Sequence, residues 1–216
     1  MFILVVIGII GLIVLVIVLS IRHEKKRTEA LRTFAQANGF SFEDIADSPE
    51  VIGLPAIELF NRGHSKRTSN TMRGEIASAA VRVLDYRYTV GSGKNSSTSH
   101  QTLVAVSTGD AMLPSFTLAP ETFFHKIGQA FGYQDIDIDQ FPEFSKRYLL
   151  RGGDEAAIRT LFGGRVVDAY MNGLVCNVEV RDGWLFVFKA GKRLKPEEIQ
   201  PRIESAFAFL FELTGA

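Results

Sequence analysis

The residues best suited to contact an anion lie in one polar stretch, NRGHSKRTSNTMRG, at positions 61–74. Arg and Lys side chains donate charge-assisted hydrogen bonds to phosphate and carboxylate oxygens. The pattern favours an ordinary solvated loop, balanced by acidic side chains at positions 135–143. The alternative is a basic loop that contacts an anionic headgroup, a phosphate or an acidic partner. The stretch holds no carboxylate, and its candidate contacts are Arg62, His64, Lys66, Arg67 and Arg73.

Two other motifs resemble known sites but lack essential residues. GSGK at 91–94 would need an earlier glycine and a following Ser or Thr to form a phosphate-binding loop, and Tyr88 and Asn95 stand in those places. The alternating run DIDID at 135–139 would need a glycine to start a calcium loop, where Gln140 stands. The first motif favours an exposed turn, and the second favours a strand with one solvated face.

Histidine and cysteine give no metal or nucleophile pattern. The four histidines are far apart and have no His or Cys at ligand spacing, and one cysteine cannot build a structural zinc site. Cys176 alternates with apolar residues, which favours a buried side chain rather than a nucleophile. The sequence therefore predicts no catalytic residue, no cofactor and no metal.

The element that must position these residues is the apolar stretch at 2–21, FILVVIGIIGLIVLVIVLSI. Twenty residues in a helix span about 30 Å, the thickness of a bilayer's hydrocarbon core. A cleaved signal peptide would need a basic segment before the core and a small-x-small cleavage site, and neither is present. A run that is apolar on every face and lies at the extreme terminus also disfavours a buried core helix. We therefore expect one transmembrane helix that contacts the bilayer through residues 2–21.

Charge next to this span predicts its orientation. A basic cluster follows the span and is opposed only by Glu24, whereas no Lys or Arg precedes it. The positive-inside rule places such a cluster, and residues 22–216, in the cytoplasm, with the N-terminus outside. The single cysteine fits a reducing compartment. The same side chains are candidate contacts for lipid headgroups: Arg22, Lys25, Lys26 and Arg27.

The rest of the chain predicts an α+β fold in which helices cover antiparallel β-hairpins. Its 24 basic and 24 acidic residues balance, which argues against general nucleic-acid binding. Strands are predicted at 54–60 and 147–152, and hairpins at 75–107 and 175–188. Helices are predicted at 24–38, continuing from the span, and at 120–131, 155–162, 165–171 and 201–213, with 196–200 as a separate turn.

Patterning also predicts which side chains face the core. In the second hairpin, Cys176, Val178 and Val180 alternate with Asn177, Glu179 and Arg181, so the polar set should face solvent. The last helix should bury Ile203, Ala206, Phe207, Leu210 and Phe211. A hairpin followed by a Phe-rich helix occurs twice, which suggests two related subdomains. The predicted division is therefore 1–21 transmembrane, 22–39 juxtamembrane helix, 40–145 first subdomain and 146–216 second subdomain.

Three segments resemble a family of uncharacterised bacterial membrane proteins with one N-terminal span and a cytoplasmic domain of unknown function. They are LDYRYTVGSGKNSSTSHQT at 84–102, FFHKIGQAFGYQDIDID at 123–139 and FPEFSKRYLLRGGDE at 141–155. The resemblance implies a bacterial source and an inner-membrane location. It implies no activity and no catalytic residue.

Together these patterns favour a membrane-tethered, non-catalytic module that binds a protein partner or the membrane surface. They identify neither the partner nor the oligomeric state. The alternative is an enzyme that acts on a membrane-derived or small phosphorylated substrate, with the basic loop and Lys94 as anion contacts. A deep pocket that gathers His64 or His100 with Asp85 would favour the enzyme.

Overall fold

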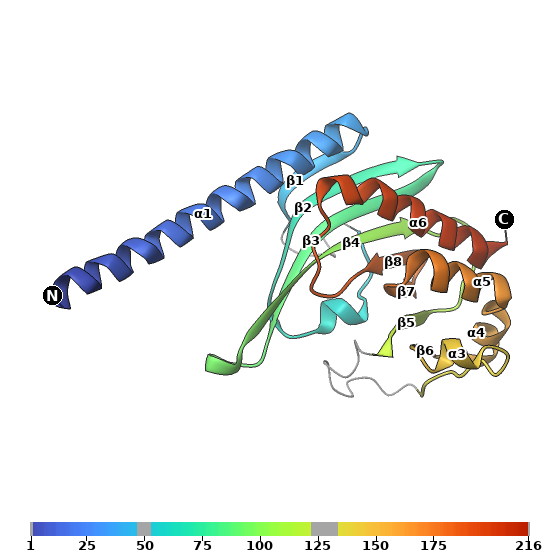
Figure 1. The fold of residues 1–216 in the computed structure, drawn as a ribbon. Coiled ribbons are helices and arrows are strands. Elements are labelled where there is room, and N and C mark those ends of the chain that lie inside the picture. Colours follow the sequence, from blue (N-terminus) through green and yellow to red (C-terminus); the bar gives the residue numbers. More distant parts are fainter. Residues whose placement is uncertain (1, 47–52, 122–133, 216) are drawn as a thin grey trace.

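The structure, a computed structural model, describes residues 2–46, 53–121 and 134–215. One open sheet of eight antiparallel strands, in the order β1-β2-β3-β4-β8-β7-β5-β6, forms the body of the molecule (Figure 1). The strands are β1 Ser41–Ala46, β2 His64–Ile76, β3 Ala79–Val90, β4 Ser97–Ser107, β5 Phe116–Pro120, β6 Tyr148–Gly152, β7 Asn177–Arg181 and β8 Trp184–Phe188. The helices are α1 Phe2–Ala37, α3 Pro142–Ser145, α4 Glu155–Leu161, α5 Gly164–Ala169 and α6 Pro196–Thr214, with shorter turns η2 Glu58–Asn61, η3 Gly93–Asn95 and η4 Tyr170–Leu174. The predicted α+β class is confirmed.

Both faces of the sheet carry a hydrophobic core. One face packs against α1, α6 and the helices between β6 and β7, and this larger core includes Leu31, Val83 and Ile203. The other face is covered by the segment that leads into η2, where Ile57 and Phe60 pack against strands β3, β4 and β8. Burial on both faces explains the uninterrupted apolar run of β4 at 103–106, where Leu103 and Ala105 belong to one core and Val104 and Val106 to the other.

Helix α1 runs without a break from the apolar stretch into the domain (Figure 1). Its 36 residues correspond to about 54 Å of helix. The described side chains of residues 6–21 are all exposed, whereas Leu31 and Ala35 are buried against the sheet. Gly39, with φ of +73°, ends the helix, as is common at this position. The helix is long and apolar enough to cross a membrane, and its C-terminal third is part of the domain.

Several predicted elements are confirmed. The two hairpins form as β3–β4 and β7–β8, and Asp182 and Gly183 have the positive φ values, 47° and 76°, that a type I′ turn requires. The Asp154 carboxylate caps α4 by accepting a hydrogen bond of 3.0 Å from the Ala157 amide. The helix predicted at 120–131 lies almost wholly outside the described residues.

Other predictions are wrong for identifiable reasons. Most of the basic stretch is not a loop but strand β2, whose backbone pairs with β1 on one side and with β3 on the other. Residues 54–60 form no strand but an irregular segment that ends in η2, consistent with Pro55, which offers no N–H to a ladder. Strand β5 was not predicted, and no strand forms at 135–139, although Ile136 and Ile138 are buried there.

The last helix is longer than expected, and its predicted buried stripe is confirmed at Ile203, Ala206 and Leu210. Pro201 lies inside α6, which begins at Pro196 rather than after a separate turn. Phe209 and Leu213 face the core, whereas Phe211 is 53% exposed. The division into subdomains at residue 145 stays a prediction; strand β8 of the second range lies between β4 of the first and β7.

Candidate functional site

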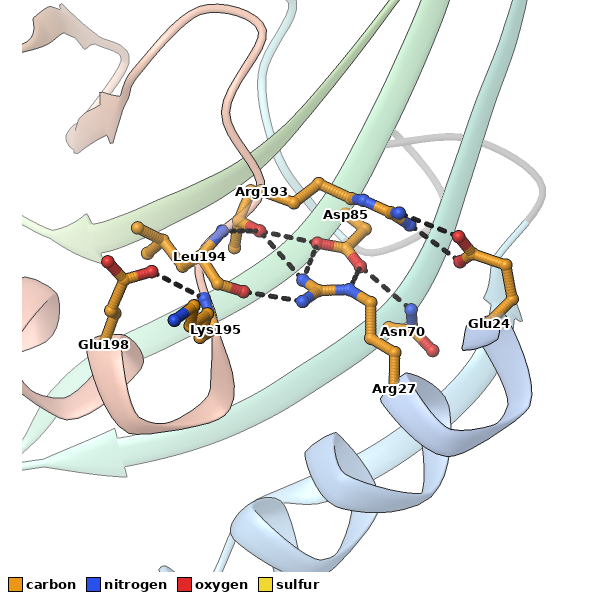
Figure 2. A network of polar contacts seen from close by, with 9 residues as sticks. Glu24, Arg27, Asn70, Asp85, Arg193, Leu194, Lys195 and Glu198 are labelled. Carbon is orange, nitrogen blue, oxygen red and sulfur yellow. Dashed lines mark hydrogen bonds and ion pairs between the residues drawn. The ribbon is translucent and has the colours of Figure 1, made fainter. Parts of the chain in front are cut away.

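The junction between α1 and the sheet is built around a buried ion pair. Nε and Nη2 of Arg27 donate hydrogen bonds of 2.9 and 2.8 Å to Oδ2 and Oδ1 of Asp85 (Figure 2). The two side chains are 10% and 6% exposed. Arg27 lies on the same face of α1 as Leu31 and Ala35, four and eight residues later, so apolar packing and the ion pair act on one stripe of the helix. This contact joins the membrane-proximal end of the domain to the base of the apolar helix.

Three further residues satisfy the remaining polar atoms of the pair. Asn70 Nδ2 and Thr102 Oγ1 donate to Asp85 at 2.9 and 2.6 Å, and Nη1 of Arg27 donates to the carbonyl oxygen of Leu194 at 2.7 Å (Figure 2). Asn70 reaches the carboxylate from a β-bulge in β2, where its φ is +51°. Bulges commonly redirect a side chain in this way, and Asn tolerates such a φ. The charged groups of the buried pair are therefore hydrogen-bonded by a network that draws on α1, β2, β3, β4 and the segment before α6.

A second ion pair closes the junction on its solvent side. Arg193 donates two hydrogen bonds of 2.7 Å to the carboxylate of Glu24, one turn before Arg27 (Figure 2). The hydrogen bond to Arg193 lowers the pKa of Glu24, and the same contact raises the pKa of Arg193. The segment before α6 thus holds α1 at two successive turns.

A groove of about 760 Å³ opens between α1 and the sheet beside this network. Its wall on the α1 side runs from Ser20 and Ile21, at the end of the apolar stretch, to Arg32. Its floor includes Arg87 of β3 and His100 of β4. The groove therefore begins where the bilayer would end and continues along the domain.

The five residues predicted to form one basic loop do not form one cluster. Arg67 lines the groove, and Arg73 forms an ion pair of 2.9 Å with Glu43. His64 Nε2 lies 2.9 Å from the carbonyl oxygen of Gly91, and Lys66 is exposed. Arg62 is buried on the opposite face of the sheet, beside Glu58 and Glu179.

The four predicted headgroup contacts also differ from one another. Arg27 is occupied by Asp85, whereas Arg22, Lys25 and Lys26 are exposed at the base of the apolar helix. The interaction of these three with lipid stays a prediction. Lys25 also lines the groove.

Sequence patterning missed a buried polar cluster on the other face of the sheet. Glu179 is 2% exposed, and the Glu58 amide donates to both of its carboxylate oxygens at 3.1 and 3.0 Å. Arg181 lies 3.5 Å from the same carboxylate. Burial raises the pKa of Glu179 to about 7 and raises that of Glu58 as well. The expected outward orientation of Asn177 and Glu179 is therefore wrong, because η2 covers this face; no local signal reveals a contact 121 residues apart.

This cluster is nearly closed, and the grouping of His64 or His100 with Asp85 that would favour the alternative enzyme function does not form. The cavity beside Glu179 is about 20 Å³, room for about one water. His64 is hydrogen-bonded near the β3–β4 hairpin, and Asp85 is held by Arg27 rather than by His100.

Among the described residues, no three His, Cys, Asp or Glu side chains gather as a metal site. Cys176 is buried and unpaired, and burial raises the pKa of its thiol to about 12.

The fold and the junction define a class: an open antiparallel sheet domain docked on a long N-terminal helix that can span a membrane. The structure is similar to the crystal structure of the mycobacterial trehalose monomycolate transport factor A, TtfA, with a TM-score of 0.65. The alignment covers 87% of this chain and 94% of that chain at 12% sequence identity, so the likeness establishes the fold. No family model and no curated protein matches the chain. Its likeness to the bacterial family named above stays a prediction.

We expect Asp85→Ala to lower the free energy of unfolding by about 3–5 kcal/mol, because it leaves the Arg27 charge buried without a partner. Chemical denaturation of the full-length chain in detergent, followed by circular dichroism, measures this change. The matched control is Glu43→Ala, which removes an exposed ion pair and should cost less than about 1 kcal/mol. Equal losses in the two variants would contradict a central role for the buried pair.

Replacing Glu179 by Gln should change how stability depends on pH. The folded carboxyl titrates at about 7 and the unfolded one near 4.5, so the wild-type protein loses stability as pH rises between these values. The loss amounts to about 3 kcal/mol and is complete above pH 7. Unfolding measured across this window should show a shallower slope for Glu179→Gln, whereas the exposed control Glu197→Gln should keep the wild-type slope. Parallel curves for wild type and Glu179→Gln would contradict the raised pKa.

Proposed function

We propose that this chain is a bacterial inner-membrane protein whose cytoplasmic domain is a non-catalytic module of a membrane transport process. Its helix α1 anchors the domain and also sets its orientation relative to the bilayer. In this role the domain binds a membrane-embedded protein partner or the membrane surface and works as an accessory factor.

The observation that supports this proposal is the continuity of α1 from the apolar stretch into the core. A flexible tether would suffice to keep an enzyme near the membrane. Here Arg27 and Glu24 are held by the domain within two turns of the apolar stretch, so rotation of the domain about the helix is blocked. A fixed orientation is useful when one face of the domain must meet another component of the membrane.

The structural neighbour supports a transport role rather than a reaction. That neighbour is a mycobacterial transport factor for trehalose monomycolate. We extend to this chain the general role of an accessory factor in envelope transport, and leave the transported molecule open. The basic cluster after the span supports the cytoplasmic orientation.

Orientation can be tested with a single engineered thiol. Ser92→Cys places a cysteine on the exposed β3–β4 turn, while the native Cys176 is buried and has a raised thiol pKa, so it should stay unlabelled. A membrane-impermeant maleimide should label Ser92→Cys only after the cells are opened. Labelling in intact cells would place the domain outside and overturn the cytoplasmic assignment.

Partner binding should depend on the rotational setting of α1. Two alanines inserted between Ile21 and Arg22 turn the domain by about 200° about the helix, whereas four turn it by about 40° with a larger displacement along the axis. After mild cross-linking of native membranes, we expect the four-alanine variant to retain a stoichiometric partner and the two-alanine variant to lose it. The background control is the same span fused to an unrelated soluble domain.

Two results would contradict this proposal. Capture of the same partner by both insertion variants would show that orientation is unimportant. A preparation with no partner beyond the span-fusion control would remove the accessory-factor role and direct attention to lipids.

A further inference from the structure

The floor of the groove carries a row of basic residues that face one another across three strands. Arg67 of β2 lies directly opposite Arg87 of β3, and Arg87 lies directly opposite His100 of β4. Residues paired in this way have Cβ atoms about 5 Å apart on the same face of the sheet, and like charges placed so are destabilising. The sheet therefore maintains an unfavourable arrangement at the groove.

Within residues 2–46, 53–121 and 134–215, no carboxylate forms an ion pair with this row. The groove is lined by five Lys or Arg side chains and three carboxylates, and each of the three carboxylates is already in an ion pair with Arg32 or Arg193. Neither Arg67 nor Arg87 forms an ion pair with any residue in the described parts of the chain, and the same holds for Lys25. By contrast, Arg27 and Arg73 of the neighbouring elements each have an acidic partner.

The neighbouring histidine reports the resulting positive field. Partial burial lowers the pKa of His100, and the charges of Arg193 and Arg87 lower it further, although Glu24 and Asp85 act in the opposite sense. An anion in the groove would oppose the effect of the two arginine charges on this pKa. The strand pairing and the charges around His100 thus both indicate a positively charged groove.

We propose that the groove between α1 and the sheet binds a phosphate-bearing anion, with Arg67 and Arg87 as its principal contacts and Lys25 and His100 beside it. Guanidinium groups match phosphate oxygens in pairs, and two of them on adjacent strands can hold one phosphate from both sides. A volume of about 760 Å³ accommodates a headgroup-sized ligand.

The position of the groove indicates how such a ligand would arrive. Ser20 and Ile21 line its membrane end, so a lipid lying along α1 can place its headgroup among the basic side chains while its chains stay beside the apolar helix. The β3–β4 hairpin projects from the domain on the same side as the N-terminal half of α1 (Figure 1). A lipid headgroup and free phosphate share the recognised chemistry. This inference deepens the proposed function, on which it rests for the placement of the domain against the bilayer.

The test uses the full-length chain in nanodiscs and follows the ring resonances of His100 by NMR. One arm adds inorganic phosphate to the chain in phosphatidylcholine discs. The other arm compares phosphatidylcholine discs with discs that also contain phosphatidylglycerol. A shift in either arm supports the site, and the arm that responds identifies the source of the phosphate. No shift in either arm overturns the proposal.

Matched double variants connect the response to the proposed contacts. Arg67→Gln with Arg87→Gln should weaken binding by about tenfold or more, because two charge-assisted contacts are lost. Lys146→Gln with Lys189→Gln removes the same charge from exposed positions outside the groove and should leave binding unchanged. Equal weakening in the two double variants would show general electrostatic attraction and overturn the proposal.

Stability separates a binding role from a structural role. Removing two arginines that repel each other should leave the melting temperature unchanged or raise it, whereas loss of a structural contact would lower it. A lowered melting temperature together with unchanged binding overturns the proposal. Partner capture in native membranes is measured separately, so failure of headgroup binding with intact capture would overturn this inference and leave the proposed function standing.

Discussion

The structure depends on one buried ion pair, between Arg27 of α1 and Asp85 of β3. A carboxylate in the middle of a sheet is unfavourable unless its charge and its lone pairs are satisfied, and here Arg27, Asn70 and Thr102 supply four hydrogen bonds. Apolar packing of Leu31 and Ala35 alone would allow α1 to slide or turn on the sheet. The bidentate geometry of the pair fixes both its register and its rotation.

Charged side chains lie in different environments on the two faces of the sheet. This difference distinguishes a structural polar cluster from a candidate recognition site. On the η2 face, Glu179 is covered, its carboxylate accepts two backbone hydrogen bonds, and the adjacent cavity is small. On the α1 face, Arg67 and Arg87 stand opposite each other beside an open groove. The first arrangement encloses a carboxyl group whose charged form is disfavoured by burial. In the second, Arg67 and Arg87 have no acidic partner among the described residues, so recognition of an anion is better assigned to the α1 face.

Local sequence patterns predict several helices and hairpins, whereas the candidate site is formed by contacts between residues far apart in the sequence. The apolar run at 2–21, the Asp182–Gly183 turn and the Asp154 cap each carry their own signal, and the structure confirms the helix, the hairpin and the cap. The role of Arg27 cannot be predicted from sequence. A basic residue after a span indicates topology whether or not it forms an ion pair with an acidic residue 58 positions later. The prediction that Glu179 faces solvent is wrong for the same reason. Alternation shows that a strand has two faces, but it does not show that a distant segment covers the second face.

The same limit explains why a basic stretch was recognised while its function was not. Composition showed that residues 61–74 hold cations without acids, but the bulges of β2 decide where each cation goes. Asn70 turns into the junction, Arg73 pairs with Glu43, and Arg67 alone among the five candidates reaches the groove. There Arg67 lies opposite Arg87 of β3. The aromatic and acidic residues beside Arg87 in the sequence give no indication that it contributes to a basic site. A site of this kind arises from the register of two strands, and register becomes visible only when the sheet is assembled.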